Sequence, residues 1–171
     1  QLKKLNWKYV EGNKLSPDES DERKSFKHFI LKKKLSQSIK KINPWISDDN
    51  LKTVVRSLTT IENLSLIEAN QKNYNSLIKY ITVEQDIDGR RQNRTVKIID
   101  FDNIENNNFI VTNQFKVAGL KENIVPDIIL FVNGLPLAVI ECKSPYITNP
   151  MEAGINQLFR YSNTRRPDEK E

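Results

Sequence analysis

Apolar residues recur at helical spacing through the first half of the chain, and this period predicts three helices. The first spans about 25–42 and ends at Asn43-Pro44, because the residue before a proline avoids the helical region. The second and third begin after Ser47 and Ser65, which can cap them. The stripes expected to face inward are Phe26, Ile30, Leu35, Ile39 and Ile42; Leu51, Val54, Val55 and Leu58; and Ile67, Tyr74, Leu77, Ile78 and Ile81.

The pattern then changes to that of strands. Segments 81–85 and 95–101 are predicted to pair through the turn residues Asp88-Gly89, and 109–117 is a further strand. Segments 125–132 and 135–142 flank Asn133-Gly134, a strong hairpin signal, and are apolar on both faces, as in central strands covered on both sides. A last helix is predicted over 151–163. This order predicts an α/β fold with a mixed central sheet flanked by helices, in one domain over 1–171.

Composition narrows the class of protein. The 171 residues contain one cysteine and one histidine, which excludes a disulfide framework and disfavours zinc sites and Ser-His-Asp catalysis. No apolar run approaches the ~20 residues of a membrane helix, so we expect no membrane partner. The net charge of +5 is carried by residues 1–41, which hold 12 Lys and Arg against 5 Asp and Glu. Charge alone is therefore weak evidence for nucleic acid.

Two acidic residues interrupt the apolar hairpin at its open end. Pro126-Asp127 stands at the start of one strand and Glu141-Cys142-Lys143 at the end of the other. Glu141 and Lys143 share a strand face, since side chains alternate. A two-residue turn would place Asp127 on the opposite face, whereas a three-residue turn, Val132-Asn133-Gly134, would place it on the same face. We predict the three-residue, bulged turn, with Gly134 left-handed.

Two carboxylates on one face repel each other, and a divalent cation would relieve the repulsion. Hard oxygen ligands favour Mg²⁺, with Mn²⁺ as a substitute. The backbone carbonyl of Cys142 could be a third ligand, and Lys143 could position a water that attacks a phosphodiester. The same residues are also compatible with a structural Glu-Lys pair and a loop cap at Asp127. We expect the Cys142 side chain to be a small buried hydrophobe on the other face.

The wider sequence resembles a known family. Asp127, followed fourteen positions later by Glu141-x-Lys143, matches the PD-(D/E)XK nuclease signature. The flanking stretches VTNQF at 111–115, PDIILFVNGLPLAVIECKSP and QLFRY at 157–161 resemble the N-terminal nuclease domain of type I restriction enzyme R (HsdR) subunits. The resemblance covers essentially the whole chain and implies a restriction-endonuclease-like core.

The resemblance implies roles for these residues. Asp127, Glu141 and Lys143 would form a magnesium-dependent centre that cleaves double-stranded DNA. Gln157 and Tyr161 form the family's Q-x-x-x-Y motif, and an i, i+4 pair shares one helical face. Arg160 is a candidate DNA contact. Without the resemblance, Tyr161 would be an ordinary aromatic at the edge of the core and Gln157 a surface residue.

The resemblance also implies features that the sequence does not contain, namely a further site glutamate and ATP-binding domains. Related nucleases often carry a further glutamate on an N-terminal helix, which we expect before Gln1, with Glu68 as a weaker candidate. The chain has no G-x-x-x-x-G-K-[ST] phosphate loop, so ATP binding would belong to translocase domains of a longer, cytoplasmic prokaryotic protein. Its partners would be the methyltransferase and specificity subunits. The rival interpretations are a repair or recombination nuclease, and a non-cleaving DNA-binding or subunit-docking module on the same fold.

Overall fold

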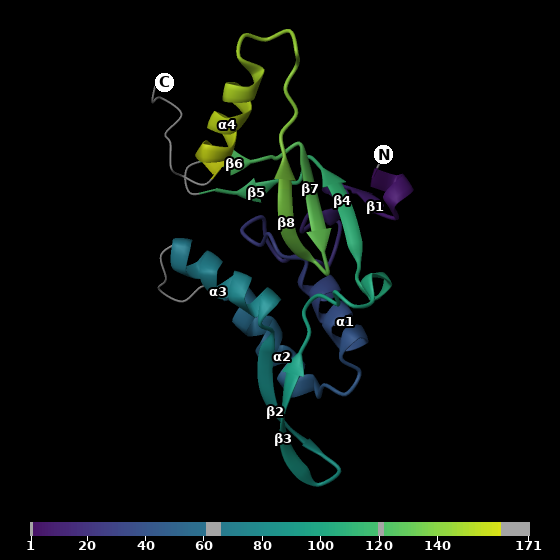
Figure 1. Cartoon of the computed structure of the whole chain (residues 1–171). Helices are drawn as coiled ribbons and strands as arrows, with labels where there is room; N and C mark the ends of the chain where they lie inside the picture. Colours follow the sequence, from purple (N-terminus) through teal and green to yellow (C-terminus); the bar gives the residue numbers. More distant parts are fainter. Residues whose placement is uncertain (1, 61–65, 120–121, 162–171) are drawn as a thin grey trace. The chain divides into compact units, whose positions relative to one another are not determined.

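The computed structural model describes residues 2–60, 66–119 and 122–161 (Figure 1). The chain divides into two compact units, which are described separately. The first comprises 1–29, 110–130 and 136–171, and the second comprises 30–109 and 131–135. The assignment of 1–171 to one endonuclease domain stays a prediction. Within the described residues, no helix combines the length and the apolar character that crossing a membrane requires.

A four-stranded sheet, most of which belongs to the first unit, has the order β1-β4-β7-β8 (Figure 1). The strands are β1 (Lys8–Glu11), β4 (Phe109–Asn113), β7 (Ile128–Val132) and β8 (Leu135–Ile140). β1 runs parallel to β4, with Tyr9 opposite Val111. β4 and β7 run antiparallel, because the Gln114 amide donates to the Asp127 carbonyl at one end and the Asn133 amide donates to the Asn108 carbonyl at the other. The predicted mixed sheet of an α/β fold is therefore confirmed.

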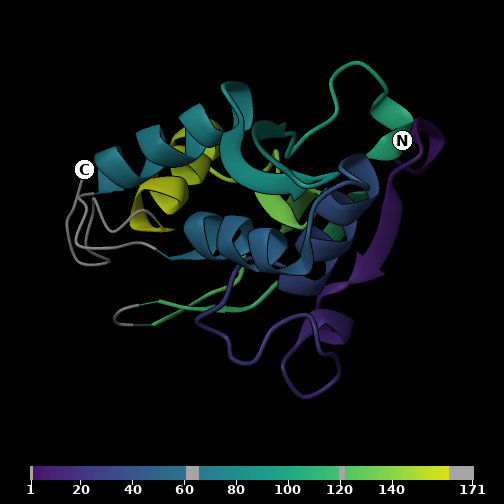
Figure 2. The ribbon, with the colours of Figure 1, turned by 90° about the horizontal axis from the view of Figure 1, so that it is seen from below.

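Short elements complete the first unit. They are η1 (Leu2–Leu5), η2 (Gly12–Leu15), the paired β5 (Val117–Ala118) and β6 (Asn123–Ile124), and α4 (Pro150–Tyr161). Figure 2 shows β1 leading into η2 in purple. The strand predicted over 109–117 stops at Asn113, because Gln114 adopts a left-handed backbone with φ of 50°. The helix predicted over 151–163 begins at Pro150, and residues 162–163 lie outside the described part.

The prediction that 135–142 forms a central strand is wrong. β8 ends at Ile140 and lies at the edge of the sheet, and its residues 137–140 are all exposed. An uninterrupted apolar run does not distinguish a strand covered on both faces from an edge strand with uncovered apolar side chains. β7 is the inner strand, with Ile129 and Phe131 buried.

The second unit consists of α1 (Lys32–Ile42), α2 (Asp48–Thr59), α3 (Leu66–Ile78), β2 (Ile81–Ile87), β3 (Arg90–Val96) and η3 (Ile104–Asn106). Its core joins apolar residues from these elements and from Leu135: Ile30, Leu35, Ile39, Ile46, Val54, Leu58, Val83, Val96 and Ile98. Ser47 caps α2 as predicted, since its hydroxyl accepts from the Asn50 amide at 3.3 Å. Ser65 lies outside the described residues.

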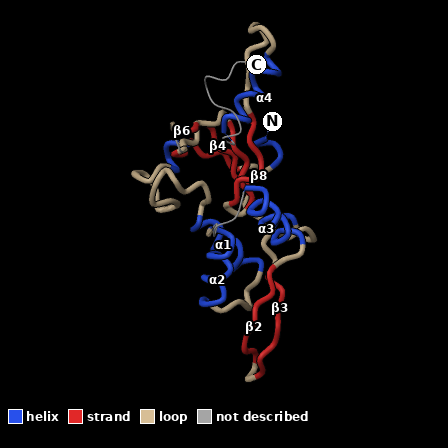
Figure 3. Tube along the Cα trace, turned by 90° about the vertical axis from the view of Figure 1, so that its left-hand side faces the viewer, coloured by secondary structure: helices blue, strands red, loops and turns tan. Residues whose placement is uncertain are grey.

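Three predictions for this unit need correction. The first helix begins at Lys32 instead of 25, and the Leu31 amide at its start donates to the Gly134 carbonyl. On α3, Ile67, Tyr74 and Ile78 are exposed, by 81%, 60% and 49%, so the predicted inward stripe is wrong at these positions. Leu77 and Ile81, from the same stripe, do pack against the core. β3 covers Arg90–Val96 instead of 95–101, because β2 and β3 pair from Ile81 opposite Val96 as far as Ile87 opposite Arg90, a long hairpin visible in Figure 3.

The turn at Asn133-Gly134 differs from the predicted one. β7 ends at Val132 and β8 begins at Leu135, which leaves two residues in the turn. Asn133 and Gly134 both have positive φ, of 53° and 86°, as a two-residue type I′ turn requires. Gly134 has a second reason to be glycine, since an added Cβ would lie 2.5 Å from the Leu31 carbonyl oxygen.

Asn133 is fully buried, and its side chain replaces backbone partners for the asparagine-rich loop that precedes β4. Its Nδ2 donates to the Ile98 carbonyl and to Asn107 Oδ1, both at 2.8 Å. Its Oδ1 accepts from the Asn108 amide at 2.7 Å. The loop has no strand partner among the described residues to pair with its backbone groups. The Asn133 side chain takes that place, and each lost hydrogen bond would leave a desolvated polar group without a partner.

This network generates the first prediction. Asn133→Gly keeps a residue that tolerates the left-handed backbone and removes only the amide, and should lower the free energy of unfolding by about 2–3 kcal/mol. Asp88→Gly is the control, because Asp88 has the same φ of 53° in an exposed turn. Urea unfolding measures both changes. Equal stabilities of the two variants would show that the Asn133 amide contributes nothing beyond its backbone conformation.

Candidate active site

The two acidic residues lie just beyond the ends of β7 and β8. Asp127 directly precedes β7 and Glu141 directly follows β8, at the open end of the hairpin. The Cys142 amide donates to Asp127 Oδ2 at 2.8 Å, and the Asp127 amide donates to Glu141 Oε1 at 3.4 Å. These bonds join the two segments directly.

The juxtaposition therefore arises differently from the predicted way. A two-residue turn was expected to place Asp127 and Glu141 on opposite faces, and the turn does have two residues. Strict alternation, however, holds only within regular strands. β7 has five residues and β8 has six, and both carboxylates belong to extended segments beyond the ladder. Hydrogen bonds between these segments, instead of strand register, bring the carboxylates together.

Glu141 is the most unusual group of the cluster. Its side chain is 2% exposed, and its Oε2 is buried without a hydrogen bond from any described residue. Lys143 Nζ lies 4.0 Å from that oxygen. Burial raises the pKa of Glu141, and the nearby charge of Asp127 raises this pKa further. The Tyr161 hydroxyl, the Asp127 amide and the charge of Lys143 lower the pKa of Glu141, but they do not cancel the rise. A carboxylate in this position is short of positive charge.

A line of polar side chains on α4 holds Lys143. Lys143 Nζ donates to Gln157 Oε1, and Gln157 Nε2 donates to the Tyr161 hydroxyl. The hydroxyl in turn donates to the Val125 carbonyl at 3.4 Å. Burial raises the pKa of Tyr161. Gln157 and Tyr161 therefore do share one face of α4, and that face points to the cluster, so neither is simply a surface residue.

Sequence reasoning missed Gln114. This residue follows β4, the strand beside β7, and its Nε2 donates to Asp127 Oδ1 at 3.2 Å. The available signal was a polar residue directly after the buried strand β4. This strand lies beside β7, which Asp127 precedes. It carried no weight because the neighbouring positions from 103 to 114 are rich in asparagine.

Three further candidates have different outcomes. The Cys142 side chain is exposed, so the predicted buried hydrophobe is wrong; only its backbone amide takes part in the contacts of the cluster. The role of its carbonyl as a metal ligand stays a prediction. Arg160 is exposed on α4, as a DNA contact requires, but this role is also untested. Glu68 lies on α3 in the second unit and stays an untested candidate.

The donor atoms suit a hard divalent cation. Within the described residues, no group of three or more His, Cys, Asp and Glu side chains gathers, so the cluster offers two carboxylates. Mg²⁺ commonly binds through one or two carboxylates and keeps several waters, and does not need a cage of protein ligands. The buried Glu141 Oε2 has no other described donor, and a cation would satisfy it. The residues present therefore fit the metal that the sequence predicts.

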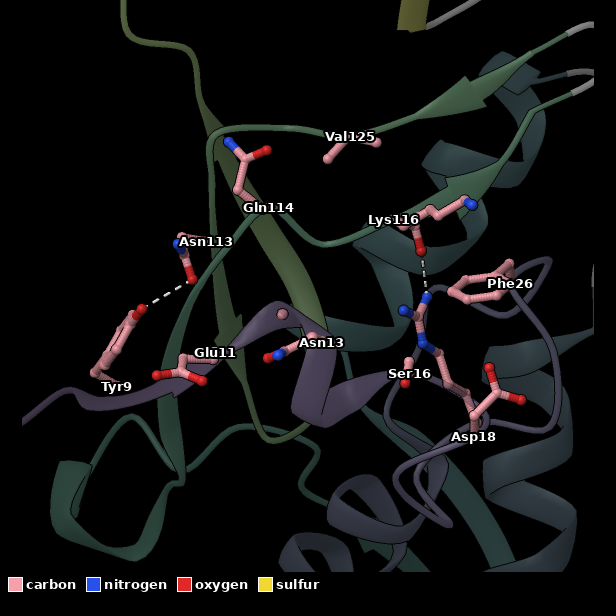
Figure 4. A pocket seen from close by; sticks show the side chains of 12 residues that line it. Tyr9, Glu11, Asn13, Ser16, Asp18, Phe26, Asn113, Gln114, Lys116 and Val125 are labelled. Atoms are coloured by element: carbon pink, nitrogen blue, oxygen red, sulfur yellow. Dashed lines mark hydrogen bonds between the residues drawn. The ribbon is translucent and has the colours of Figure 1, made fainter.

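A pocket of about 610 Å³ lies beside the cluster in the first unit. Gln114 and Val125 line one wall of it (Figure 4). Gln114 also donates to Asp127, and the Val125 carbonyl accepts from Tyr161. Arg23 also lines the pocket; it is 3% exposed, and its guanidinium carbon stacks 3.9 Å from the centre of the Phe115 ring. Burial lowers the pKa of Arg23 to about 10, so the side chain is charged at neutral pH.

Comparison with known proteins matches this arrangement to one family. The model of the type I restriction enzyme R protein N terminus matches residues 1–171. The chain belongs to this family. It is 33% identical over 147 residues to the type I restriction enzyme HindI endonuclease subunit of Haemophilus influenzae, covering 85% of the chain and 14% of that protein.

A second relative comes from an archaeon. The chain is 38% identical over 175 residues to a Methanocaldococcus jannaschii protein named as a candidate type I restriction enzyme MjaIXP endonuclease subunit. The match covers 95% of the chain and 17% of that protein. The chain thus spans about one sixth of the length of these relatives. The family that the sequence resemblance implied is confirmed.

The burial of Glu141 generates a prediction about pH. Its pKa is raised from the ordinary value of 4.5, so the folded state binds its proton more tightly than the unfolded state does. The stability that this proton provides is complete below pH 4.5 and is lost as pH rises through the folded pKa. Glu141→Gln removes this loss of stability, so the metal-free variant should gain stability relative to the wild type as pH rises above 4.5.

Urea unfolding in the presence of a chelator measures the difference at each pH. Glu105→Gln is the control, because Glu105 is exposed and its replacement removes the same charge without the burial. A constant difference between Glu141→Gln and the wild type across this range would contradict the prediction.

Proposed function

We propose that this chain is the DNA-cleaving part of a type I restriction enzyme R protein and that it hydrolyses phosphodiester bonds with Mg²⁺. One observation carries the proposal: a buried carboxylate oxygen of Glu141 has no described hydrogen-bond donor, beside a second carboxylate and a lysine. A structural Glu-Lys pair would be expected to make a closer contact than 4.0 Å. The family and the nuclease names of its relatives support the same chemistry.

The carboxylates of Asp127 and Glu141 and the carbonyl of Cys142 would hold the cation. When bound, Mg²⁺ supplies a Lewis acid for the phosphate and lowers the pKa of a bound water. Asp127 has a fixed orientation, since Cys142 and Gln114 donate to its two oxygens. An oriented carboxylate binds a cation without first losing rotational freedom.

Lys143 would act on the phosphate and the attacking water. Its ammonium group is held by Gln157 and stays 4.0 Å from Glu141, instead of closing into a tight ion pair. It can therefore donate to a non-bridging phosphate oxygen and offset the charge that develops there. Tyr161 supports this position through Gln157 and anchors the end of α4 to the Val125 carbonyl.

The larger assembly follows from the family. We propose that the parent protein works in the prokaryotic cytoplasm with methyltransferase and specificity subunits, and that ATP-binding translocase domains in the rest of that protein move double-stranded DNA. In such an enzyme the position of cleavage is set by translocation, so this part need not read bases. Arg160, exposed on α4 near the cluster, would contact the DNA backbone.

Replacement of Asp127 tests the chemistry. Asp127→Ala removes one of two carboxylate ligands, and Mg²⁺-dependent nicking of plasmid DNA by the full R protein in its complex should fall by about 100-fold or more. Asp49→Ala is the control, because this aspartate is exposed on α2 and belongs to the second unit. Equal cleavage by Asp127→Ala and the wild type would favour a non-cleaving module.

Replacement of Gln157 tests how Lys143 is held. Gln157→Leu removes the acceptor of the ammonium group while keeping a helix-forming side chain of similar size, and cleavage should fall roughly 10-fold. DNA binding, measured by filter retention without Mg²⁺, should not change. Gln71→Leu, which removes an exposed helical hydrogen bond to Asn75, is the matched control. An equal loss of cleavage in both variants would contradict a specific role for Gln157.

A further inference from the structure

Gln114 contacts Asp127 through both its backbone and its side chain. Its amide donates to the Asp127 carbonyl at 3.1 Å, and its Nε2 donates to Asp127 Oδ1 at 3.2 Å. The two atoms that accept these bonds belong to one residue on the neighbouring chain segment. Gln114 therefore fixes the backbone and the carboxylate of Asp127 together.

The side-chain bond completes the orientation of the carboxylate. The Cys142 amide occupies one lone pair of Oδ2, and the Gln114 amide occupies one lone pair of Oδ1. Each carboxylate oxygen has two lone pairs, so one on each oxygen stays available to a cation. Donors on both oxygens fix the plane of the group, whereas a single donor would let it rotate.

We propose that Gln114 is a positioning residue for the metal-binding carboxylate of Asp127. The inference rests on the proposed function, because it concerns the same cluster. Gln114 does not touch the cation or the phosphate; it acts by holding Asp127 in the orientation that binds the cation.

The backbone of Gln114 supports this role. A non-glycine residue with φ of 50° is strained, and such residues persist where the surroundings hold them. Gly12, the first residue of η2, packs against the backbone of the turn at Asn113 and Gln114, because a Cβ on Gly12 would lie 2.2 Å from the Asn113 carbonyl oxygen and 2.7 Å from the Gln114 carbonyl oxygen. Asn13, the next residue, lines the same pocket as these two residues (Figure 4).

The rival explanation is that Gln114 only forms a turn. Glycine adopts a left-handed backbone without strain, so a residue needed only for the turn would be replaced by glycine with no loss. A residue needed for its amide would not. Gln114→Gly therefore separates the two explanations, because it should raise or maintain stability while it weakens metal binding.

The experiment measures Mn²⁺ binding to the chain by titration calorimetry, and its melting temperature by circular dichroism. Gln114→Gly should weaken Mn²⁺ binding about 10-fold, the low end for loss of a group that orients a metal ligand. Its melting temperature should equal or exceed that of the wild type. In the full enzyme, cleavage by the variant should recover at high Mg²⁺ concentration, since the defect lies in metal affinity.

Asn149→Gly is the matched control. Asn149 has φ of 52° and its side chain also donates to a carboxylate, that of Glu152 at 3.2 Å, but does not contact Asp127. This variant should bind Mn²⁺ as the wild type does. Unchanged Mn²⁺ binding by Gln114→Gly, with a wild type that does bind the ion, would overturn the inference alone. A wild type whose Mn²⁺ binding is absent, or is untouched by Asp127→Ala, would overturn the proposed metal site and this inference with it.

Discussion

The candidate site depends on one electrostatic constraint, the burial of the Glu141 carboxylate. With 2% of its side chain exposed and Oε2 without a described donor, Glu141 costs the metal-free fold free energy. Lys143 could reduce this cost by moving closer, but Gln157 holds its ammonium group. Asp127 increases the cost, because a second negative charge raises the pKa of Glu141 further. Lys143, the Tyr161 hydroxyl and the Asp127 amide stabilise the charge of Glu141 only in part, since its pKa stays raised. A divalent cation is the partner that this arrangement favours.

The hairpin that carries the carboxylates is specified at both of its ends by polar groups. At the closed end, Asn133 and Gly134 adopt left-handed conformations, and the buried Asn133 side-chain amide makes three hydrogen bonds. At the open end, the Cys142 and Asp127 amides close the gap between the chain segments. The apolar residues between supply burial, which is not directional. Hydrogen bonds therefore decide which residues of the hairpin meet, and this is why the site forms despite a turn shorter than predicted.

The sequence predicts the residues of the site better than it predicts their geometry. Asp127 and Glu141 stand out because charge interrupts an apolar hairpin, and spacing alone places Gln157 and Tyr161 on one helical face. The turn length was wrong because asparagine and glycine suit both a two-residue and a three-residue turn. The status of β8 as an edge strand and the exposure of Ile67 and Tyr74 depend on which elements cover them, which an apolar pattern does not contain. Gln114 was missed because it follows an asparagine-rich stretch in which one more polar amide does not stand out, and its contact with Asp127 is visible only in the structure.

Gln114 and Glu141 share one physical property: each raises the free energy of the folded state. Gln114 has a strained backbone and Glu141 a desolvated charge, and both residues contact Asp127. Sequence patterns predict the favourable parts of a fold, such as the cap at Ser47 and the core stripe of α2, because local preference and structure agree there. At the site, the structure goes against the local preferences of Gln114 and Glu141, and the surrounding hydrogen bonds stabilise these unfavourable conformations. Some residues lower the stability of the fold and lie next to the groups that the chemistry needs. Substitution at these positions can therefore change function without lowering stability.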